Sequence, residues 1–310
     1  RNKIIISCGG TGGHIFPAIE IAKACKEINP DIDLVFVGVI NRMEMRKVPN
    51  AGFPIIGIWV QALYRKSILK NLLFPIKLFI SFIHSLLILL YHRPAAVIGT
   101  GGFATGPILF AASMLSCKTY IQEQNCFPGL TNKLLGKMVN KIFVAHNDMD
   151  RFFIADKIIN LGNPVRQSLN TMSNTNIIKQ SRSFFGLSDK KFTILVVGGS
   201  LGAEPINRGI HKHVNTFIEN DCQLLWQTGS LQYEYYNNLK LKNCSIYSFI
   251  ERMDLAYSAA DIVISRAGAI AITEISFLKK ASILIPSLHV TDNHQHKNAQ
   301  YLAHNNACIL

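Results

Sequence analysis

The sequence IIISCGGTGGHIFP, at residues 4–17, places a glycine-rich turn directly after a run of β-branched residues. A second run of this design, TILVVGGSLGA at residues 193–203, opens the second half of the chain. A buried strand that leads through a glycine turn into a helix is the building unit of nucleotide-binding α/β folds. Because the unit occurs twice, we predict an α/β protein with two Rossmann-like domains, whose parallel sheets face a central cleft.

The composition is that of a globular protein with an excess of positive charge. The 310 residues are 49% hydrophobic, which is enough for two buried cores. The formal net charge of +13 suggests an acidic partner such as a phosphorylated substrate, an anionic lipid or a nucleic acid, unless lysine is simply favoured throughout the sequence. The seven cysteines are scattered without a C-x-x-C pair, so neither a disulfide framework nor a zinc site is indicated.

Strand and helix patterns alternate along both halves of the chain. Buried strands are predicted at residues 3–8, 33–38, 95–99, 118–125, 141–145, 192–197, 223–227, 245–249, 262–265 and 282–285. The first helix is predicted at residues 17–28, with Pro17 at its start. The alternation favours parallel sheets with right-handed crossovers.

The segment NLGNPVR, at residues 160–166, has little periodicity and lies midway between the two large glycine turns. We therefore predict an N-terminal domain at residues 1–163 and a C-terminal domain at residues 164–310. The chain starts at Arg1 and ends on the strand-like ACIL, so we interpret it as a fragment truncated at its C-terminus.

Residues 72–91, LLFPIKLFISFIHSLLILLY, form the most apolar segment. Lys77 and His84 interrupt it, which leaves a stretch shorter than the ~20 residues that a membrane span needs. We predict a buried amphipathic helix with one side that touches lipid; a true span is the alternative.

Three candidate site residues carry recognisable chemistry. His14 ends the first glycine turn and is the best candidate for a general base, because an unperturbed imidazole titrates near working pH; a histidine that only caps or packs the turn is the alternative. Ser200 has two interpretations: the nucleophile of a G-x-S-x-G hydrolase elbow, or a hydroxyl donor to a pyrophosphate at a helix N-terminus. Glu274 could accept two hydrogen bonds from a ribose, or could be a solvated surface charge.

Nine segments together resemble the MurG-type N-acetylglucosaminyltransferases of bacterial peptidoglycan synthesis, and they occur in that family's order over almost the whole chain. They are GGTGGHIFPA, IGTGGFATGP, QEQNCFPGLTNK, GNPVR, VVGGSLGAEPIN, WQTG, FIERM, ADIVISRAGAIAITE and HQHKNA. The resemblance implies a GT-B fold and an inverting transfer of N-acetylglucosamine from UDP-N-acetylglucosamine to the 4-hydroxyl of the muramyl sugar of lipid I, which gives lipid II. It implies no metal and no cofactor.

The resemblance also assigns roles to individual residues. His14 would be the catalytic base, and Gly101, Gly102 and Thr105 would face the acceptor. The donor would contact Thr11, Gly12, Gly13, Asn125, Arg166, Ser200, Ile250, Ala269, Ile270, Ala271, Ile272, Thr273, Glu274 and Gln295. Among these, Arg166 and Ser200 would meet the pyrophosphate, Ile250 the uracil, Glu274 the ribose and Gln295 the N-acetylglucosamine.

The resemblance further implies a peripheral enzyme at the cytoplasmic face of the bacterial inner membrane. Its partners would be UDP-N-acetylglucosamine, lipid I, the anionic membrane surface and proteins of cell-wall synthesis and division, with no nucleic acid. Two rival functions stay open: a serine hydrolase that uses Ser200, and an inactive, membrane-associated nucleotide-binding protein.

Overall fold

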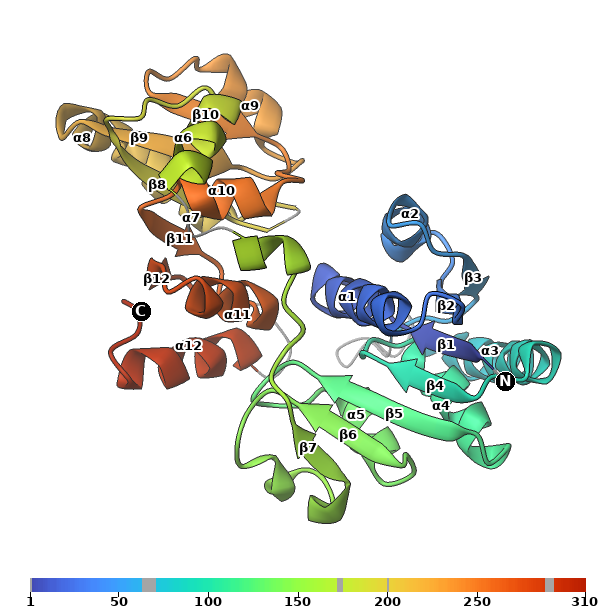
Figure 1. Cartoon of the computed structure of the whole chain (residues 1–310). Coiled ribbons are helices and arrows are strands. Elements are labelled where there is room, and N and C mark those ends of the chain that lie inside the picture. Colours follow the sequence, from blue (N-terminus) through green and yellow to red (C-terminus); the bar gives the residue numbers. More distant parts are fainter. Residues whose placement is uncertain (1, 63–70, 172–174, 200, 288–292) are drawn as a thin grey trace. The chain divides into compact units, whose positions relative to one another are not determined.

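The computed structural model describes residues 2–62, 71–171, 175–199, 201–287 and 293–310. The chain divides into two compact units, Arg1–Pro164 and Val165–Leu310. The predicted division, after residue 163, lies one residue earlier. Each unit is an α/β domain built on its own parallel sheet (Figure 1). These are two Rossmann-like domains, as predicted, and the central cleft stays a prediction.

In the described part of unit 1 the sheet has seven strands. They are β1 (Lys3–Ser7), β2 (Asp33–Val39), β3 (Ile55–Ile58), β4 (Ala96–Gly99), β5 (Lys118–Glu123), β6 (Lys141–Val144) and β7 (Ile158–Asn160). Their order is β3-β2-β1-β4-β5-β6-β7, and all neighbours are parallel. The first glycine turn therefore follows the strand at the point where the chain order reverses, which is where open α/β sheets bind ligands.

Helices cover both faces of this sheet. They are α1 (Gly12–Ile28), α2 (Glu44–Asn50), α3 (Phe74–His92), α4 (Thr105–Met114) and α5 (Leu130–Gly136), followed by the short 3₁₀ helices η2 (Met149–Arg151) and η3 (Ala155–Lys157). Successive strand residues point to opposite faces. Accordingly, Ile5 packs in one core cluster with Ile108 and Leu109, and Ile6 packs in another with Ile15 and Phe36.

The predicted start of the first helix at Pro17 was wrong. Helix α1 begins at Gly12, directly after the glycine turn, and Pro17 lies inside it. Thr11 is the N-cap in an extended conformation, and its carbonyl accepts hydrogen bonds from the N–H groups of His14 and Ile15. The turn and the helix are thus continuous, so that His14 stands on the first helical turn.

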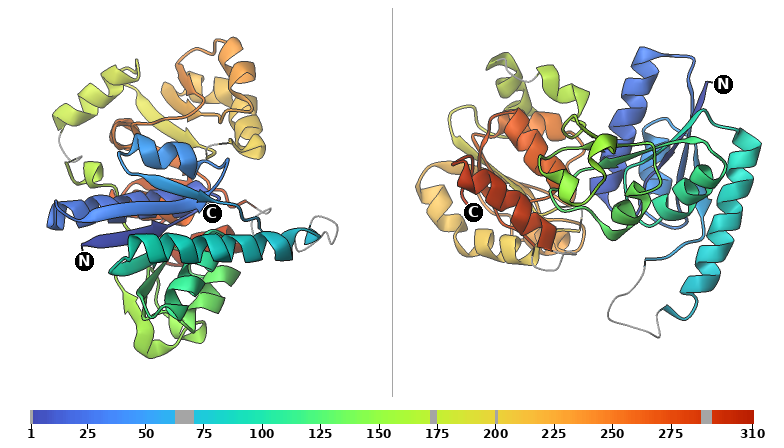
Figure 2. Two further views of the ribbon diagram at one scale, coloured as in Figure 1. Left: turned by 90° about the vertical axis from the view of Figure 1, so that its right-hand side faces the viewer. Right: turned by 90° about the horizontal axis from the view of Figure 1, so that it is seen from below.

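Helix α3 was predicted to be a buried amphipathic helix with one side that touches lipid. The apolar exposed side is present, but less of the helix is buried than this prediction implies. It runs beside α4 on the outside of unit 1 (Figure 2). Its buried residues are Ser81, Ser85, Ile88 and Leu89, while most of its large apolar side chains are exposed. By length and composition the helix could cross a membrane. The small serines allow close packing on the unit, and the apolar surface faces outward.

In the described part of unit 2, five parallel strands have the order β10-β9-β8-β11-β12. The strands are β8 (Phe192–Val197), β9 (Cys222–Gln227), β10 (Cys244–Tyr247), β11 (Ile262–Ser265) and β12 (Ala281–Leu284). The helices are η4 (Gln167–Thr171), α6 (Thr175–Phe184), α7 (Glu204–Lys212), α8 (Val214–Glu219), α9 (Tyr233–Asn238), α10 (Met253–Ala259), α11 (Ala269–Phe277) and α12 (His294–His304). All five strands lie within two residues of their predicted bounds.

Candidate functional site

The first glycine turn holds the imidazole of His14 by its Nδ1 atom. Nδ1 lies 3.2 Å from the Gly9 carbonyl oxygen and 3.2 Å from Thr11 Oγ1. A carbonyl oxygen can only accept a hydrogen bond, so the contact with Gly9 assigns the ring proton to Nδ1 and the lone pair to Nε2. His14 therefore packs on the turn, as the alternative interpretation stated, and also has the tautomer in which Nε2 can take a proton.

A second glycine turn of unit 1, at residues 100–102 between β4 and α4, packs directly against the first. Thr100 Oγ1 donates a 2.7 Å hydrogen bond to the His14 carbonyl oxygen. Gly102 has a φ of 87°, and a Cβ atom there would collide with the Gly9 carbonyl oxygen. A Cβ atom on Gly101 would lie 3.0 Å from His14 Nε2. Only glycine permits this approach, which brings the peptide backbone of the second turn to the imidazole.

The predicted acceptor residues belong to this arrangement. Thr105, at the start of α4, donates a 2.9 Å hydrogen bond from Oγ1 to the Gly101 carbonyl oxygen. The structure therefore brings Gly101, Gly102 and Thr105 together with His14 in unit 1. Thr11, Gly12 and Gly13 adjoin them as the cap and first residues of α1.

Asn125 follows β5 and is oriented by a buried carboxylate. Glu123, 2% exposed, accepts hydrogen bonds from the Asn125 backbone N–H at 3.0 Å and from its Nδ2 at 3.2 Å. It also accepts from Asn132 Nδ2 at 2.7 Å and from the Gly129 N–H at 3.4 Å. Burial raises the pKa of the Glu123 carboxyl, and these donors oppose that rise.

In unit 2 the turn between β8 and α7 is equally crowded. A Cβ atom on Gly202 would collide with the Thr228 carbonyl oxygen. The side chain of Gln227 donates to the Gly199 carbonyl oxygen at 3.1 Å and accepts from the Ile250 N–H at 2.8 Å. This glutamine joins the glycine turn to the segment predicted to meet uracil. The Ile250 side chain itself is buried, and Ser200 lies outside the described residues.

Glu274 lies on α11 and is 3% exposed, so the alternative of a solvated surface charge was wrong. Its Oε1 is 3.0 Å from Arg166 Nε, which places Arg166 at the predicted ribose carboxylate. The buried Tyr257 hydroxyl is hydrogen-bonded to Glu274; burial first, and then the neighbouring charge of Glu274, raise the pKa of this tyrosine well above its usual value. A buried carboxylate between a cation and a phenol has a fixed position.

The remaining predicted donor residues lie on two helices. Residues 269–274, from Ala269 to Glu274, form the first two turns of α11, where Thr273 Oγ1 donates to the Ala269 carbonyl oxygen at 2.8 Å. Gln295 is in the first turn of α12, and its Oε1 accepts a 2.9 Å hydrogen bond from the Ser287 N–H. Both helices follow strands of the unit 2 sheet.

Comparison with known proteins places both units in one family. Residues 4–144 match the glycosyltransferase family 28 N-terminal domain, and residues 193–310 match the glycosyltransferase family 28 C-terminal domain. The chain belongs to glycosyltransferase family 28. The GT-B fold predicted from the sequence is confirmed by this membership.

The relatives of this family 28 chain match it over nearly its whole length. A protein from Flavobacterium psychrophilum is 47% identical over 99% of the chain and 84% of its own length. A protein from Parabacteroides distasonis is 46% identical over 100% of the chain and 85% of its own length. Both are named UDP-N-acetylglucosamine--N-acetylmuramyl-(pentapeptide) pyrophosphoryl-undecaprenol N-acetylglucosamine transferase.

A solved structure agrees with the family 28 assignment. The crystal structure of MurG from Acinetobacter baumannii superimposes with a TM-score of 0.71 at 26% identity, over 99% of this chain and 84% of that one. A UDP-GlcNAc 2-epimerase from Methanocaldococcus jannaschii has a TM-score of 0.65 at 16% identity, over 99% of this chain and 88% of that one. The second likeness concerns the fold alone.

Sequence reasoning missed the buried residues that hold the site of this family 28 chain. Glu123 stands within the quoted segment QEQN, where a carboxylate among amides at a strand end was the available signal. Glu44 gave none, because its partner Gly10 lies 34 residues away in the sequence. Gln227 stands in the quoted segment WQTG, but its partner Ile250 lies 23 residues away and its supporting role could not be predicted.

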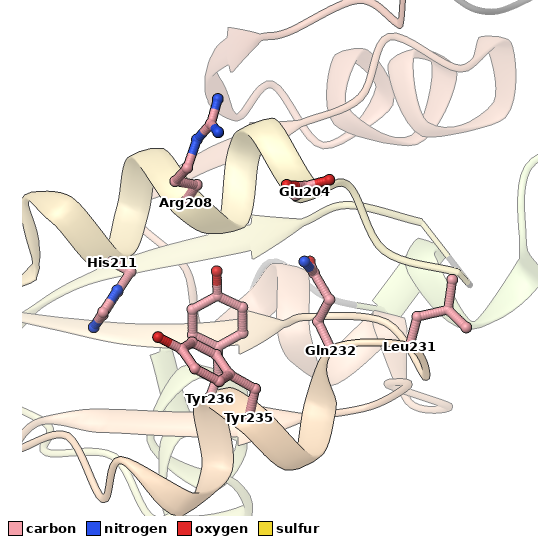
Figure 3. Close-up of a pocket in the computed structure, with 7 residues that line it drawn as sticks. All are labelled: Glu204, Arg208, His211, Leu231, Gln232, Tyr235 and Tyr236. Carbon is pink, nitrogen blue, oxygen red and sulfur yellow. The ribbon is translucent and has the colours of Figure 1, made fainter.

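A pocket of about 350 Å³ opens in unit 2 between α7 and α9 (Figure 3). The tyrosines of α9 point toward α7 in this view. The residues that line it are Glu204, Arg208, His211, Leu231, Gln232, Tyr235 and Tyr236. None of the seven is a predicted site residue, so we do not assign this pocket to the candidate site.

Proposed function

We propose that this chain transfers N-acetylglucosamine from UDP-N-acetylglucosamine to the muramyl 4-hydroxyl of lipid I, with inversion and without a metal, to give lipid II. The observation that carries the proposal is identity of 46–47% over almost the whole chain to proteins named for a transfer of N-acetylglucosamine to an undecaprenyl-linked muramyl sugar. The side chains around His14 and Glu274 provide the two chemical functions that such a transfer needs.

The first function is a base at the acceptor hydroxyl. An inverting transfer forms the new glycosidic bond on the face opposite the departing UDP, and the attacking hydroxyl must lose its proton as that bond forms. The tautomer of His14 leaves Nε2 to take this proton, next to Gly101. The backbone of Gly101 and Gly102 would then face the acceptor.

The second function is a binding site for UDP. The N-terminus of α7 presents backbone N–H groups and the positive end of a helix dipole to the pyrophosphate, supported by Ser200 and Arg166. Glu274 would accept hydrogen bonds from the ribose hydroxyls, and Ile250 would meet the uracil. Gln295 and Asn125 would contact the sugar, together with the remaining donor residues on α1 and α11.

The acceptor carries a long lipid, so the enzyme must work at a membrane surface. One face of α3 carries apolar side chains at three- or four-residue spacing. They are Ile76, Phe79, Ile83, Leu87 and Leu90. Each is at least 40% exposed. An exposed apolar face of this length is typical of a helix that lies in the membrane interface.

A basic side chain, Lys77, accompanies this face. Lys77 extends from α3 to Gln61 Oε1 at 2.8 Å and lies 5.1 Å from the Trp59 ring. Lysines near an anionic surface contribute about 1 kcal/mol each to binding. We therefore propose peripheral attachment to the cytoplasmic face of the inner membrane. Association with proteins of cell-wall synthesis and division stays a prediction.

The test is UDP release from UDP-N-acetylglucosamine in the presence of a lipid I analogue. We expect release by the wild-type chain, a fall of about 10²- to 10⁴-fold in His14→Ala, and no inhibition by a serine-reactive phosphonate. Inhibition by the phosphonate would favour the serine hydrolase, which the comparisons do not support. Binding of UDP without release would favour the inactive nucleotide-binding protein.

A further inference from the structure

Glu44 is a carboxylate that the function described above does not use, although it is completely buried. It is the first residue of α2 and has 0% exposure. Its Oε1 accepts a 3.0 Å hydrogen bond from the Val39 N–H at the end of β2. A buried carboxylate needs compensating donors, and among the described residues these are backbone N–H groups.

The other donor is the first glycine turn. The Gly10 N–H points at both carboxylate oxygens, at 3.3 Å from Oε1 and 3.4 Å from Oε2. Two glycines make room for the carboxylate: a Cβ atom on Gly9 would lie 2.9 Å from Oε1, and a Cβ atom on Gly38 would lie 2.6 Å from Cγ. The turn and the carboxylate are therefore fitted to each other.

One peptide group connects Glu44 to the imidazole. The N–H of Gly10 and the C=O of Gly9 belong to the same peptide plane. Its N–H donates to Glu44, and its C=O accepts from Nδ1 of His14. A negative charge at the N–H end polarises this peptide and makes its oxygen a stronger acceptor. The Nδ1–H tautomer is then favoured, and so is the imidazolium that forms when Nε2 takes a proton.

We propose that Glu44 is a positioning residue for the reaction, which acts through the Gly9–Gly10 peptide to orient His14 and to stabilise its protonated form. The arrangement corresponds to the carboxylate of a Ser-His-Asp triad, with a peptide group between the carboxylate and the ring. In the step it supports, the acceptor hydroxyl proton moves to Nε2, its oxygen bonds to the anomeric carbon, and the bond from that carbon to UDP breaks. This inference rests on the proposed function.

Cys8 and Glu123 are ionisable groups that also lie near this turn. Cys8 precedes it, and burial, followed by the charge of Glu44, raises the pKa of its thiol far above the working range, so it stays neutral. Glu123 reaches the second turn through Asn132, whose Nδ2 would lie 3.5 Å from a Cβ atom on Gly101. The connection to Nδ1 of His14 through one peptide is therefore specific to Glu44.

The test is a double-mutant cycle on the full chain with Glu44→Gln and His14→Ala. We expect Glu44→Gln to lower kcat about 10- to 100-fold and to leave the KM for UDP-N-acetylglucosamine within about twofold. In the His14→Ala background the same substitution should have almost no further effect. In the single variant Glu44→Gln, the acidic limb of the kcat/KM profile should move to lower pH by roughly half a unit, because the imidazolium of His14 loses a stabilising charge.

Asp261→Asn is the matched control. Asp261 accepts hydrogen bonds from the Thr193 N–H and from Arg182 in unit 2, so its change should cost stability without moving kcat or the pH profile. An equal loss of kcat from Glu44→Gln with and without His14 would overturn the proposal, as would an unmoved acidic limb.

A measurement on the wild-type chain does not depend on whether Glu44→Gln folds. The ¹⁵N spectrum of histidine-labelled protein above pH 8 reports which ring nitrogen carries the proton, and the His14 signal is assigned by its loss in His14→Ala. We expect the proton on Nδ1. A proton on Nε2 would overturn the inference even if UDP release is observed. Absence of UDP release with the proton on Nδ1 would instead contradict the proposed function.

Discussion

Replacement of Glu274 by glutamine should weaken UDP binding with little effect on the acceptor. Glutamine keeps the shape of the side chain but replaces one carboxylate oxygen with an NH₂ group, which cannot accept from a ribose hydroxyl. A hydrogen bond to a charged group contributes about 1.5–3 kcal/mol. Loss of one such bond, with the other weakened, should reduce the free energy of UDP binding by about 2–3 kcal/mol. This corresponds to about a 30- to 150-fold rise in the Kd for UDP.

The substitution should also lower stability, because it breaks the ion pair between Glu274 and Arg166, which are 3.0 Å apart. The Arg166 side chain is 21% exposed. We expect a loss of about 2 kcal/mol in the free energy of unfolding, less than for a fully buried pair, since water can reach the guanidinium. Calorimetric titration with UDP measures the Kd, and urea denaturation measures the stability.

Glu219→Gln, at the exposed end of α8, is the control for loss of one negative charge from unit 2. It should leave the Kd for UDP within about twofold. If Glu274→Gln still unfolds cooperatively and binds UDP as tightly as the control does, the ribose assignment is refuted. A loss of acceptor binding equal to the loss of UDP binding would refute it as well.

Three further predictions follow from single side chains. Leu87→Ser, on the exposed face of α3, should lower partitioning onto anionic vesicles about tenfold, whereas Leu231→Ser on unit 2, exposed by 78%, should leave it unchanged in the same sedimentation assay. Gly102→Ala should cost about 3 kcal/mol of unfolding free energy or more by urea denaturation, because a methyl group collides with the first turn; Gly52→Ala, at a similar φ of 88° but with nothing within 4 Å, should cost about 1 kcal/mol. Burial raises the pKa of Glu123 in the folded state, so its protonated carboxyl contributes stability that is complete below the unfolded pKa and is lost as pH rises through the folded pKa. The unfolding free energy of the wild type minus that of Glu123→Gln should therefore fall as pH is raised from about 4 to 8, and a flat difference would contradict the burial argument.

Much of the fold could be predicted from the sequence because the buried strands are continuous apolar runs. The run at residues 192–197 coincides with β8, and the five unit 2 strands were all found this way. Strands β3 (Ile55–Ile58) and β7 (Ile158–Asn160) were missed, since they are short and only partly buried. The extent to which α3 is buried could not be predicted either: one side was expected to touch lipid, and most of its large apolar side chains are exposed.

The site was predictable where residues stand in a local motif, such as the histidine after GGTGG. It was not predictable where a distant segment supplies the supporting contact. Glu44, in the segment RMEMRK, has the pattern of a surface helix charge, and only the fold brings it to Gly10. Likewise, the ion pair between Arg166 and Glu274 joins residues that are far apart in the sequence, and only the fold brings them together. The contact of Arg166 with the pyrophosphate stays a prediction.

The proposed inverting transfer is tested most directly by the structure of the product formed from UDP-N-acetylglucosamine and a lipid I analogue. The anomeric configuration of the transferred sugar is read from its proton coupling in the NMR spectrum. We expect a β-linked N-acetylglucosamine on the muramyl 4-hydroxyl, formed in amounts equal to the UDP released and absent with His14→Ala. An α-linked product, or UDP released with free N-acetylglucosamine and no disaccharide, would contradict the proposal.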